Sequence, residues 1–133
     1  MPTNAGGCEQ TMSEQSKNVE KELERWAKEV RRGAASLAIL ALLNKRRAYG
    51  YEIVKELEDR TEFLSLEQGT VYPLLRRMEK RDLLTSEWDH EDPAKPKKYY
   101  LLSDQGERAL AQMSEIWSLL TDEMNEIIME VPT

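Results

Sequence analysis

The feature that most constrains this chain is a regular apolar spacing close to its C-terminal end. Seven apolar residues recur there at alternating intervals of three and four, namely Leu110, Met113, Trp117, Leu120, Met124, Ile127 and Val131. This is the a/d spacing of a heptad repeat, in which one stripe of a helix packs along another helix. The stripe is widened by Ala109, Ile116, Leu119 and Ile128. The pattern predicts a long C-terminal helix that begins after the N-cap Ser103 and runs to about Glu130.

A helix of this length needs a partner, because a chain of 133 residues builds only one modest core. Its far end packs on another chain, on an N-terminal helix of its own chain, or on both. A matching apolar stripe occurs before Gly33, formed by Val19, Leu23, Trp26 and Val30. We expect a homodimer, and a monomeric helical hairpin is the alternative. The expected interface consists of Val19, Leu23, Trp26, Leu110, Met113, Trp117, Leu120, Met124 and Ile127.

Between the two stripes the hydrophobic period changes. Helical spacing continues to residue 44 and recurs over residues 49–60 and from about residue 67 to 81, where Pro73 requires a late start near Gln68–Thr70. Residues 83–88 and 97–102 then alternate or are rich in β-formers, and they flank a polar loop with two prolines. Three helices followed by a β-hairpin form a winged helix-turn-helix, which makes the fold class mainly α (α+β).

The chain is therefore expected to be one compact domain with helical extensions at both ends. Residues 1–16 are small and polar and are predicted to form a disordered tail. Residues 17–33 are predicted to be an N-terminal dimerisation helix, with Gly33 marking a kink or break unless the helix continues. Residues 34–103 would form the winged-helix domain, and residues 104–133 the C-terminal dimerisation helix.

The charge of the chain is unevenly distributed. Its net charge of −6 argues against a purely electrostatic nucleic-acid binder but leaves a sequence-specific one open. No basic residue follows Arg108, so the acidity is concentrated near the C-terminal end. Three basic clusters precede it, made of Arg31, Arg32, Lys45, Arg46 and Arg47, then Arg76, Arg77, Lys80 and Arg81, then Lys95, Lys97 and Lys98. The middle of the chain can therefore present a basic face.

The third predicted core helix has the composition of a DNA recognition helix. Gln68, Thr70 and Tyr72 lie at its start, and short polar side chains in this position reach base edges in the major groove. Arg76 and Arg77 follow one turn or more along the helix, where they can bind phosphates. The alternative is an amphipathic helix with a solvated polar face.

The tip of the predicted hairpin supports the same function. Lys95, Lys97 and Lys98 lie at the end of a loop stiffened by two prolines, and such a wing can place cations along phosphates or in a minor groove. The alternative is an ordinary surface loop, which the acidic residues of the loop favour: Asp89, Glu91 and Asp92. Because wing and recognition helix occur in the right order, double-stranded DNA is the expected partner. A winged-helix module that binds a protein is the alternative function.

Other chemistries have little support in the sequence. His90 is the only histidine and has no second His or Cys nearby, so neither a metal nor a catalytic role is expected. A Gly-rich phosphate loop and a nucleophile-elbow serine are missing, and we expect no enzyme activity and no cofactor. No apolar run approaches the roughly 20 residues of a membrane span. Cys8 is the single cysteine, which suits a cytoplasmic location.

Trp117 has two possible roles in the middle of the heptad stripe. It is either part of the packed dimer core or one wall of a pocket for a small hydrophobic or aromatic effector. Met113, one turn earlier, would make such a pocket adaptable.

Three segments resemble the PadR family of transcriptional regulators. They are Ala48–Ile53, Gly69–Glu79 and Lys97–Ser103, the last followed by Gly106, and the resemblance covers residues 35–106. It implies a winged-helix dimer that represses genes for detoxification or efflux and is released by a small molecule. It also implies a set of residues at or near DNA: Tyr49, Tyr51, Gln68, Thr70, Tyr72, Pro73, Arg76, Lys95, Lys97 and Lys98.

The single C-terminal helix resembles the short-tailed branch of that family. A tryptophan in a similar Trp–Ser context stacks on ligands at the dimer centre in that branch. The resemblance therefore implies that Trp117, followed by Ser118, is a ligand-binding residue.

Overall fold

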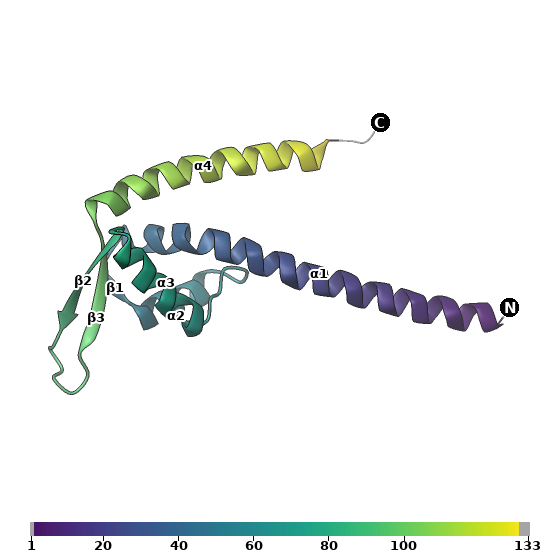
Figure 1. The fold of residues 1–133 in the computed structure, drawn as a ribbon, viewed down its shortest axis with the longest axis horizontal. Coiled ribbons are helices and arrows are strands. Elements are labelled where there is room, and N and C mark those ends of the chain that lie inside the picture. Colours follow the sequence, from purple (N-terminus) through teal and green to yellow (C-terminus); the bar gives the residue numbers. More distant parts are fainter. Residues whose placement is uncertain (1, 131–133) are drawn as a thin grey trace. The chain divides into compact units, whose positions relative to one another are not determined.

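The computed structural model describes the backbone of residues 2–130 and the side chains of residues 13–130. These residues form two compact units, of which the first ends at Gly33 and the second begins at Ala34. The first unit is helical and belongs to α1 (Pro2–Leu43), the helix drawn from purple to blue in Figure 1. After the end of α1, the second unit contains β1 (Ala48–Tyr49), α2 (Gly50–Arg60), α3 (Gln68–Lys80), β2 (Leu84–Asp89), β3 (Lys97–Leu102) and α4 (Asp104–Met129).

The structure corrects the N-terminal boundary. The predicted disordered tail over residues 1–16 is helical from Pro2 on, and Met1 lies outside the described residues. Pro2 suits the first helical position, because its missing N–H has no helical partner there. A helix that already exists extends at one hydrogen bond per residue and needs no second nucleus. The helix also continues through Gly33.

The core of the second unit lies between the end of α1, α2, α3 and one face of the sheet. Its most completely buried side chains are Ile39, Leu40, Ile53, Val71, Leu75 and Met78. Each stabilises the fold by about 1.5–3 kcal/mol relative to an exposed side chain. Tyr100 and Leu84 close this core from the sheet. The prediction of a mainly helical winged helix-turn-helix is confirmed.

Helix α3 begins where its proline predicts. Pro73 is the sixth residue of the helix, so its missing N–H costs only one of the early hydrogen bonds. A start at residue 67, the earlier end of the predicted range, would have placed the proline deeper in the helix. Glu67 is instead the N-cap, in extended conformation with φ −75° and ψ 156°.

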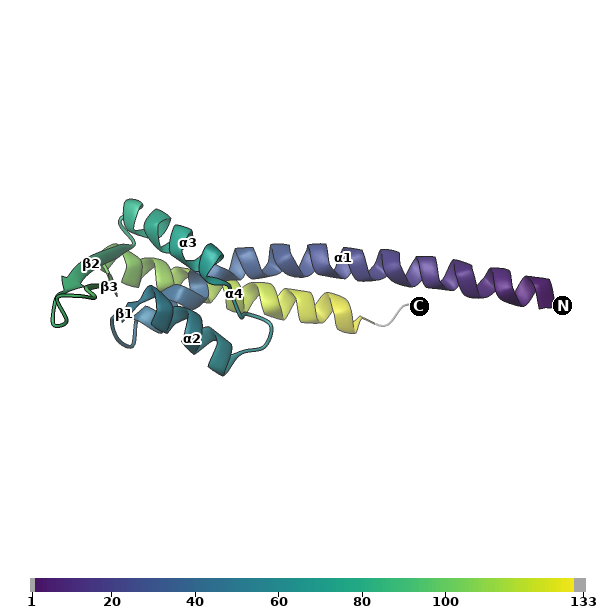
Figure 2. The ribbon, with the colours of Figure 1, turned by 90° about the horizontal axis from the view of Figure 1, so that it is seen from below.

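The wing is a three-stranded antiparallel sheet in the order β1-β3-β2. The predicted hairpin of β2 and β3 is confirmed, and Figure 2 shows it projecting beyond α2 and α3. The third strand is new: β1 pairs with β3 through Ala48↔Tyr100 and Tyr49↔Tyr99. Two residues are too few to show an alternating pattern, so no periodicity could predict this strand.

Helix α4 is anchored to the turn between α3 and β2. The Ser103 hydroxyl accepts a hydrogen bond from the Gly106 amide at 3.0 Å, which confirms the predicted N-cap. The same hydroxyl donates to the Asp82 carbonyl at 2.6 Å. Gly106 packs against the backbone, since a Cβ there would lie 2.1 Å from the Leu83 carbonyl oxygen. Val131, the last residue of the predicted stripe, lies outside the described residues.

None of the helices over residues 2–130 is long and apolar enough to cross a membrane.

Candidate nucleic-acid interface

A hollow of about 370 Å³ lies where α2, α3 and the wing meet. Its lining combines aromatic rings with cations: Tyr49, Gly50, Tyr72, Arg76, Trp88, Pro96, Lys97, Lys98 and Tyr100. Five of these residues are predicted DNA contacts, namely Tyr49, Tyr72, Arg76, Lys97 and Lys98. The structure therefore brings residues from three separate sequence segments to one surface.

Gly50 shapes one wall of this hollow. A Cβ on Gly50 would lie 2.2 Å from Cε1 of the Tyr72 ring, so only glycine lets that ring lie against the start of α2. Tyr72 is half-buried as a result. Its ring lies between α3 and α2 and lines the hollow.

The remaining predicted residues of α3 lie outside the hollow. Gln68 and Thr70 are exposed in the first turn, and Arg77 is exposed further along. Pro73 is half-buried. Among the described residues, neither Arg76 nor Arg77 forms an ion pair. These guanidinium groups are available to an external anion.

Two acidic residues on the outer face of the wing form ion pairs with an arginine of the same chain. Arg47 forms ion pairs with Glu87 and, at 3.6 Å, with Asp89. The hydrogen bond from Arg47 to Glu87 raises the pKa of the guanidinium above its usual value. Its Cζ also lies 4.2 Å from the centroid of the Tyr99 ring. Arg47 therefore offsets two of the wing's negative charges.

The aromatic residues on this face form a connected group. Tyr49 meets Tyr99 edge-on, with ring centroids 5.4 Å apart, and stacks with Tyr51 at 6.4 Å. The ammonium of Lys97 lies 4.7 Å from the Tyr49 ring centroid. Tyr51 and Lys95 are exposed. The predicted contacts Tyr49, Tyr51 and Lys97 thus belong to one surface that continues from the hollow.

Lys98 differs from the other two wing lysines. Its Nζ donates to Oε1 of Glu79 on α3 at 2.8 Å, and its side chain is only 29% exposed. The hydrogen bond to Glu79 raises the pKa of Lys98, and the hydrogen bond from Lys98 lowers the pKa of Glu79. Sequence spacing could not predict this pair, because its partners are 19 residues apart.

Trp88 is a lining residue that sequence reasoning missed. It lies opposite Lys98 in the hairpin register and is 58% exposed. Its ring stacks with His90 at 6.4 Å between centroids. The alternation of Leu84, Ser86 and Trp88 could have identified it, because it places these side chains on the core-facing side of β2. The indole of Trp88 lies on this side but past the end of the buried core. No cluster of three or more His, Cys, Asp or Glu that could hold a metal occurs among the described residues.

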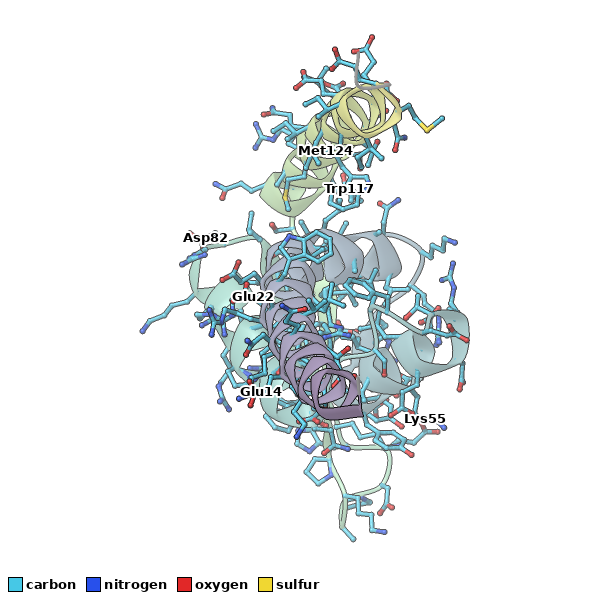
Figure 3. The ribbon with its side chains drawn as sticks, turned by 90° about the vertical axis from the view of Figure 1, so that its right-hand side faces the viewer. Glu14, Glu22, Lys55, Asp82, Trp117 and Met124 are labelled. Carbon is cyan, nitrogen blue, oxygen red and sulfur yellow. The ribbon has the colours of Figure 1, made fainter. Side chains whose placement is uncertain are left out.

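The predicted interface residues of α4 divide into two groups. Leu110 and Met113 pack against the core of their own chain. Trp117, Leu120, Met124 and Ile127 are exposed, from 43% for Trp117 to 65% for Ile127. Trp117 and Met124 project from the same side of α4 (Figure 3). In the first unit, the predicted interface residues are likewise exposed: Val19, Leu23 and Trp26.

Comparisons with known proteins assign the family. Residues 39–112 match the model of the PadR-like transcriptional regulator family. A PadR-family regulator from Eggerthella lenta is 35% identical, with 85% of this chain and 97% of that chain covered and a TM-score of 0.76. A PadR-family regulator from Clostridium difficile is 32% identical, with 71% and 98% covered and a TM-score of 0.65.

A third solved structure is Bacillus subtilis PadR in complex with operator DNA. It is 27% identical, with 60% of this chain and 45% of that chain covered and a TM-score of 0.58. The family match contains α2, α3, the wing and the start of α4, which together make up more than half of the chain. The chain therefore belongs to the PadR-like family of transcriptional regulators and is a regulator, not an enzyme.

Proposed function

We propose that this protein is a sequence-specific DNA-binding repressor that binds a palindromic operator as a homodimer. One observation carries the proposal: the helix that lines the aromatic and cationic hollow beside the wing, α3, also has an exposed polar first turn. The B. subtilis relative, whose structure contains operator DNA, supports the same partner.

The residues suggest how such a surface would read DNA. The amide of Gln68 can bond an adenine edge in two places, and Thr70 can contact a base edge or a thymine methyl. Arg76 and Arg77 lie further along the same helix, at a distance suited to phosphates that flank the groove. Lys95 and Lys97 would place charge along the adjacent backbone or minor groove. Pairing of Glu87 and Asp89 with Arg47 lowers the repulsion that an acidic wing would meet.

Binding to the protein's own upstream DNA tests the proposal. The wild-type chain should prefer that duplex to a random one of equal length, and its affinity should fall steeply with salt. Combined Arg76→Ala and Arg77→Ala should abolish DNA binding, because both proposed phosphate contacts of the helix are lost. Lys55→Ala is the matched control on α2 (Figure 3), because Lys55 is exposed and does not line the hollow. A wild-type protein without preference at low salt would refute sequence-specific binding.

The same Arg76 and Arg77 variant distinguishes DNA binding from the second candidate function, which is binding of another protein. The net charge of −6 favours a winged-helix module that binds another protein. Such a module would keep its partner's affinity after the two substitutions, whereas a DNA-binding surface would lose its ligand.

The apolar stripe of α4 supports the homodimer. Exposed Trp117, Leu120 and Met124 are large side chains that gain about 25 cal/mol for each Å² of apolar surface they bury. A two-fold dimer would present two recognition helices to half-sites about one helical turn apart. The proposed location is the cytoplasm, where an operator is accessible.

We also propose that a small planar aromatic effector binds beside Trp117 and releases the operator. The exposed indole offers a stacking face, and the acidic residues of α4 favour a cationic compound. A planar cation should quench tryptophan fluorescence in the wild type and much less in Trp117→Phe. Equal quenching in both proteins would mean that Trp26 or Trp88 reports the ligand, and it would overturn the assignment.

A further inference from the structure

We infer that Glu79 is a positioning residue that fixes the wing against the recognition helix, and that Lys98 serves this contact instead of binding a DNA phosphate. The inference rests on the proposed DNA-binding function. It divides the three wing lysines into two classes with different roles.

A single carboxylate holds both strands of the hairpin. Oε1 of Glu79 accepts a hydrogen bond from Lys98 on β3 at 2.8 Å, and Oε2 accepts one from the Ser86 hydroxyl on β2. Ser86 and Lys98 lie on the core-facing side of the sheet, where Trp88 follows in the register. The side chain of Glu79 therefore joins α3 to β2 and β3 at one point.

The contact is partly shielded from water. The side chains of Glu79 and Lys98 are 30% and 29% exposed, and the Lys98 ammonium also lies 5.0 Å from the centroid of the Tyr100 ring. Tyr100 is buried in the core. The ion pair is thus continuous with the packed interior, which restricts the side-chain freedom that weakens fully exposed pairs.

Lys98 is a poor phosphate ligand for an electrostatic reason. Its charge is offset by Glu79, so the pair presents little net charge to DNA. Lys97, its neighbour, is exposed and forms no ion pair among the described residues. Its contact with the Tyr49 ring leaves its positive charge uncompensated. A phosphate therefore attracts Lys97 more strongly than Lys98.

The position of Glu79 in α3 explains its influence on binding. It lies near the end of the helix, whereas the reading residues Gln68 and Thr70 lie in its first turn. The wing cations and the recognition helix must meet the same duplex at a fixed separation. A contact that sets the wing relative to α3 therefore changes affinity without itself touching DNA.

The salt dependence of operator binding separates the two roles. Removing one phosphate-binding cation lowers the slope of log affinity against log salt by about 0.9, or about 2 for a dimer. Lys97→Gln should show this decrease. Lys98→Gln should weaken binding by about two- to five-fold per subunit, in the range of ion-pair energies, with the slope unchanged. A slope for Lys98→Gln that falls as it does for Lys97→Gln would overturn the inference.

A charge exchange provides the decisive variant. Glu79→Lys combined with Lys98→Glu restores the ion pair with the charges reversed, so it should bind more tightly than Lys98→Glu alone. Because Glu79→Lys also adds a cation near the DNA, the recovery is compared with the effect of Glu79→Lys in the wild type; a phosphate-binding Lys98 predicts that the two gains are equal. Far-UV circular dichroism of each variant checks that the winged helix is folded.

A measurement without DNA keeps this inference distinct from the proposed function. Trp88 lies opposite Lys98, so loosening the wing should increase acrylamide quenching of its fluorescence. In a Trp26→Phe and Trp117→Phe background, Lys98→Gln should increase quenching and Lys97→Gln should not. A wild type that ignores DNA would refute the proposed function only, whereas equal quenching in both variants would refute the positioning role.

Discussion

The winged-helix body and helix α4 use their apolar residues in opposite ways. In the body, side chains such as Leu75 and Ile53 are wholly buried within one chain. Along α4, Leu120, Met124 and Ile127 are exposed although they are equally apolar. The apolar residues of the body are therefore covered by the core of one chain. The apolar stripe of α4 is exposed and needs another surface to cover it.

The two regions also differ in their charges. The body pairs its charges across elements, as Arg47 does with Glu87 and Lys98 with Glu79. Helix α4 has acidic residues in its first turn and no basic residue in its last turn. An acidic C-terminal end opposes the helix dipole, so α4 gains little stability from its own electrostatics. Stabilisation of α4 should come chiefly from packing.

A core truncation should produce the largest loss and should mark the body as the stable region. Leu75→Ala leaves a cavity at a residue with no exposed surface, and it should lower the free energy of unfolding by about 2–5 kcal/mol. Chemical denaturation followed by circular dichroism measures this. Leu119→Ala on α4, where the leucine is 58% exposed, is the matched control and should cost much less. Equal losses would mean that the two regions are equally packed.

A charge on the α4 stripe should break the proposed dimer and leave the body folded. Leu120→Glu places a carboxylate on the proposed interface, where burying it is unfavourable, and should raise the dimer dissociation constant at least ~100-fold, about 2.7 kcal/mol. Sedimentation velocity over a dilution series measures this. Ser118→Glu is the control, because Ser118 lies off the a/d positions. A variant that stays dimeric at nanomolar concentration would contradict the assigned interface.

A glycine substitution should test where α4 joins the body. Gly106→Ala brings a Cβ to 2.1 Å from the Leu83 carbonyl oxygen, and because backbone cannot move aside cheaply the cost should be about 1–3 kcal/mol. Gly69→Ala has no atom within 4 Å of its new Cβ and should stabilise the protein by up to about 1 kcal/mol. Thermal unfolding of the two variants should therefore shift in opposite directions. Two shifts of the same sign would refute the close approach at Gly106.

Local signals predict most of this architecture. Pro73 predicts the start of α3 within two residues, and the hydroxyl of Ser103 identifies the start of α4, because both effects act within one helical turn. The disordered tail is a prediction from composition alone, and composition carries no information on whether an adjoining helix extends.

The connections between distant segments could not be predicted. Arg47 meets Glu87 across 40 residues, and β1 pairs with β3 across about 50. Lys98 shares its sequence neighbourhood with Lys97, yet the pleat turns their side chains to opposite faces and only Lys98 meets Glu79. The sequence shows where a lysine occurs, whereas the role of that lysine depends on which element packs against it.

Acid titration should produce the smallest effect and should detect a charge pair of the body. Because the hydrogen bond from Lys98 lowers the pKa of Glu79, the folded state binds a proton at this carboxyl less readily than the unfolded chain does. The stabilisation is therefore complete above the ordinary glutamate pKa of about 4.3 and is lost as the pH falls through the lowered value. Glu79→Gln should cost up to about 1 kcal/mol at pH 7, and the difference from the wild type should vanish in acid. In a Lys98→Gln background the same substitution should cost less at neutral pH, because the main cause of the lowered pKa is gone. A cost that stays constant from pH 7 to the acid range would show that Glu79 contributes by packing and not through its charge.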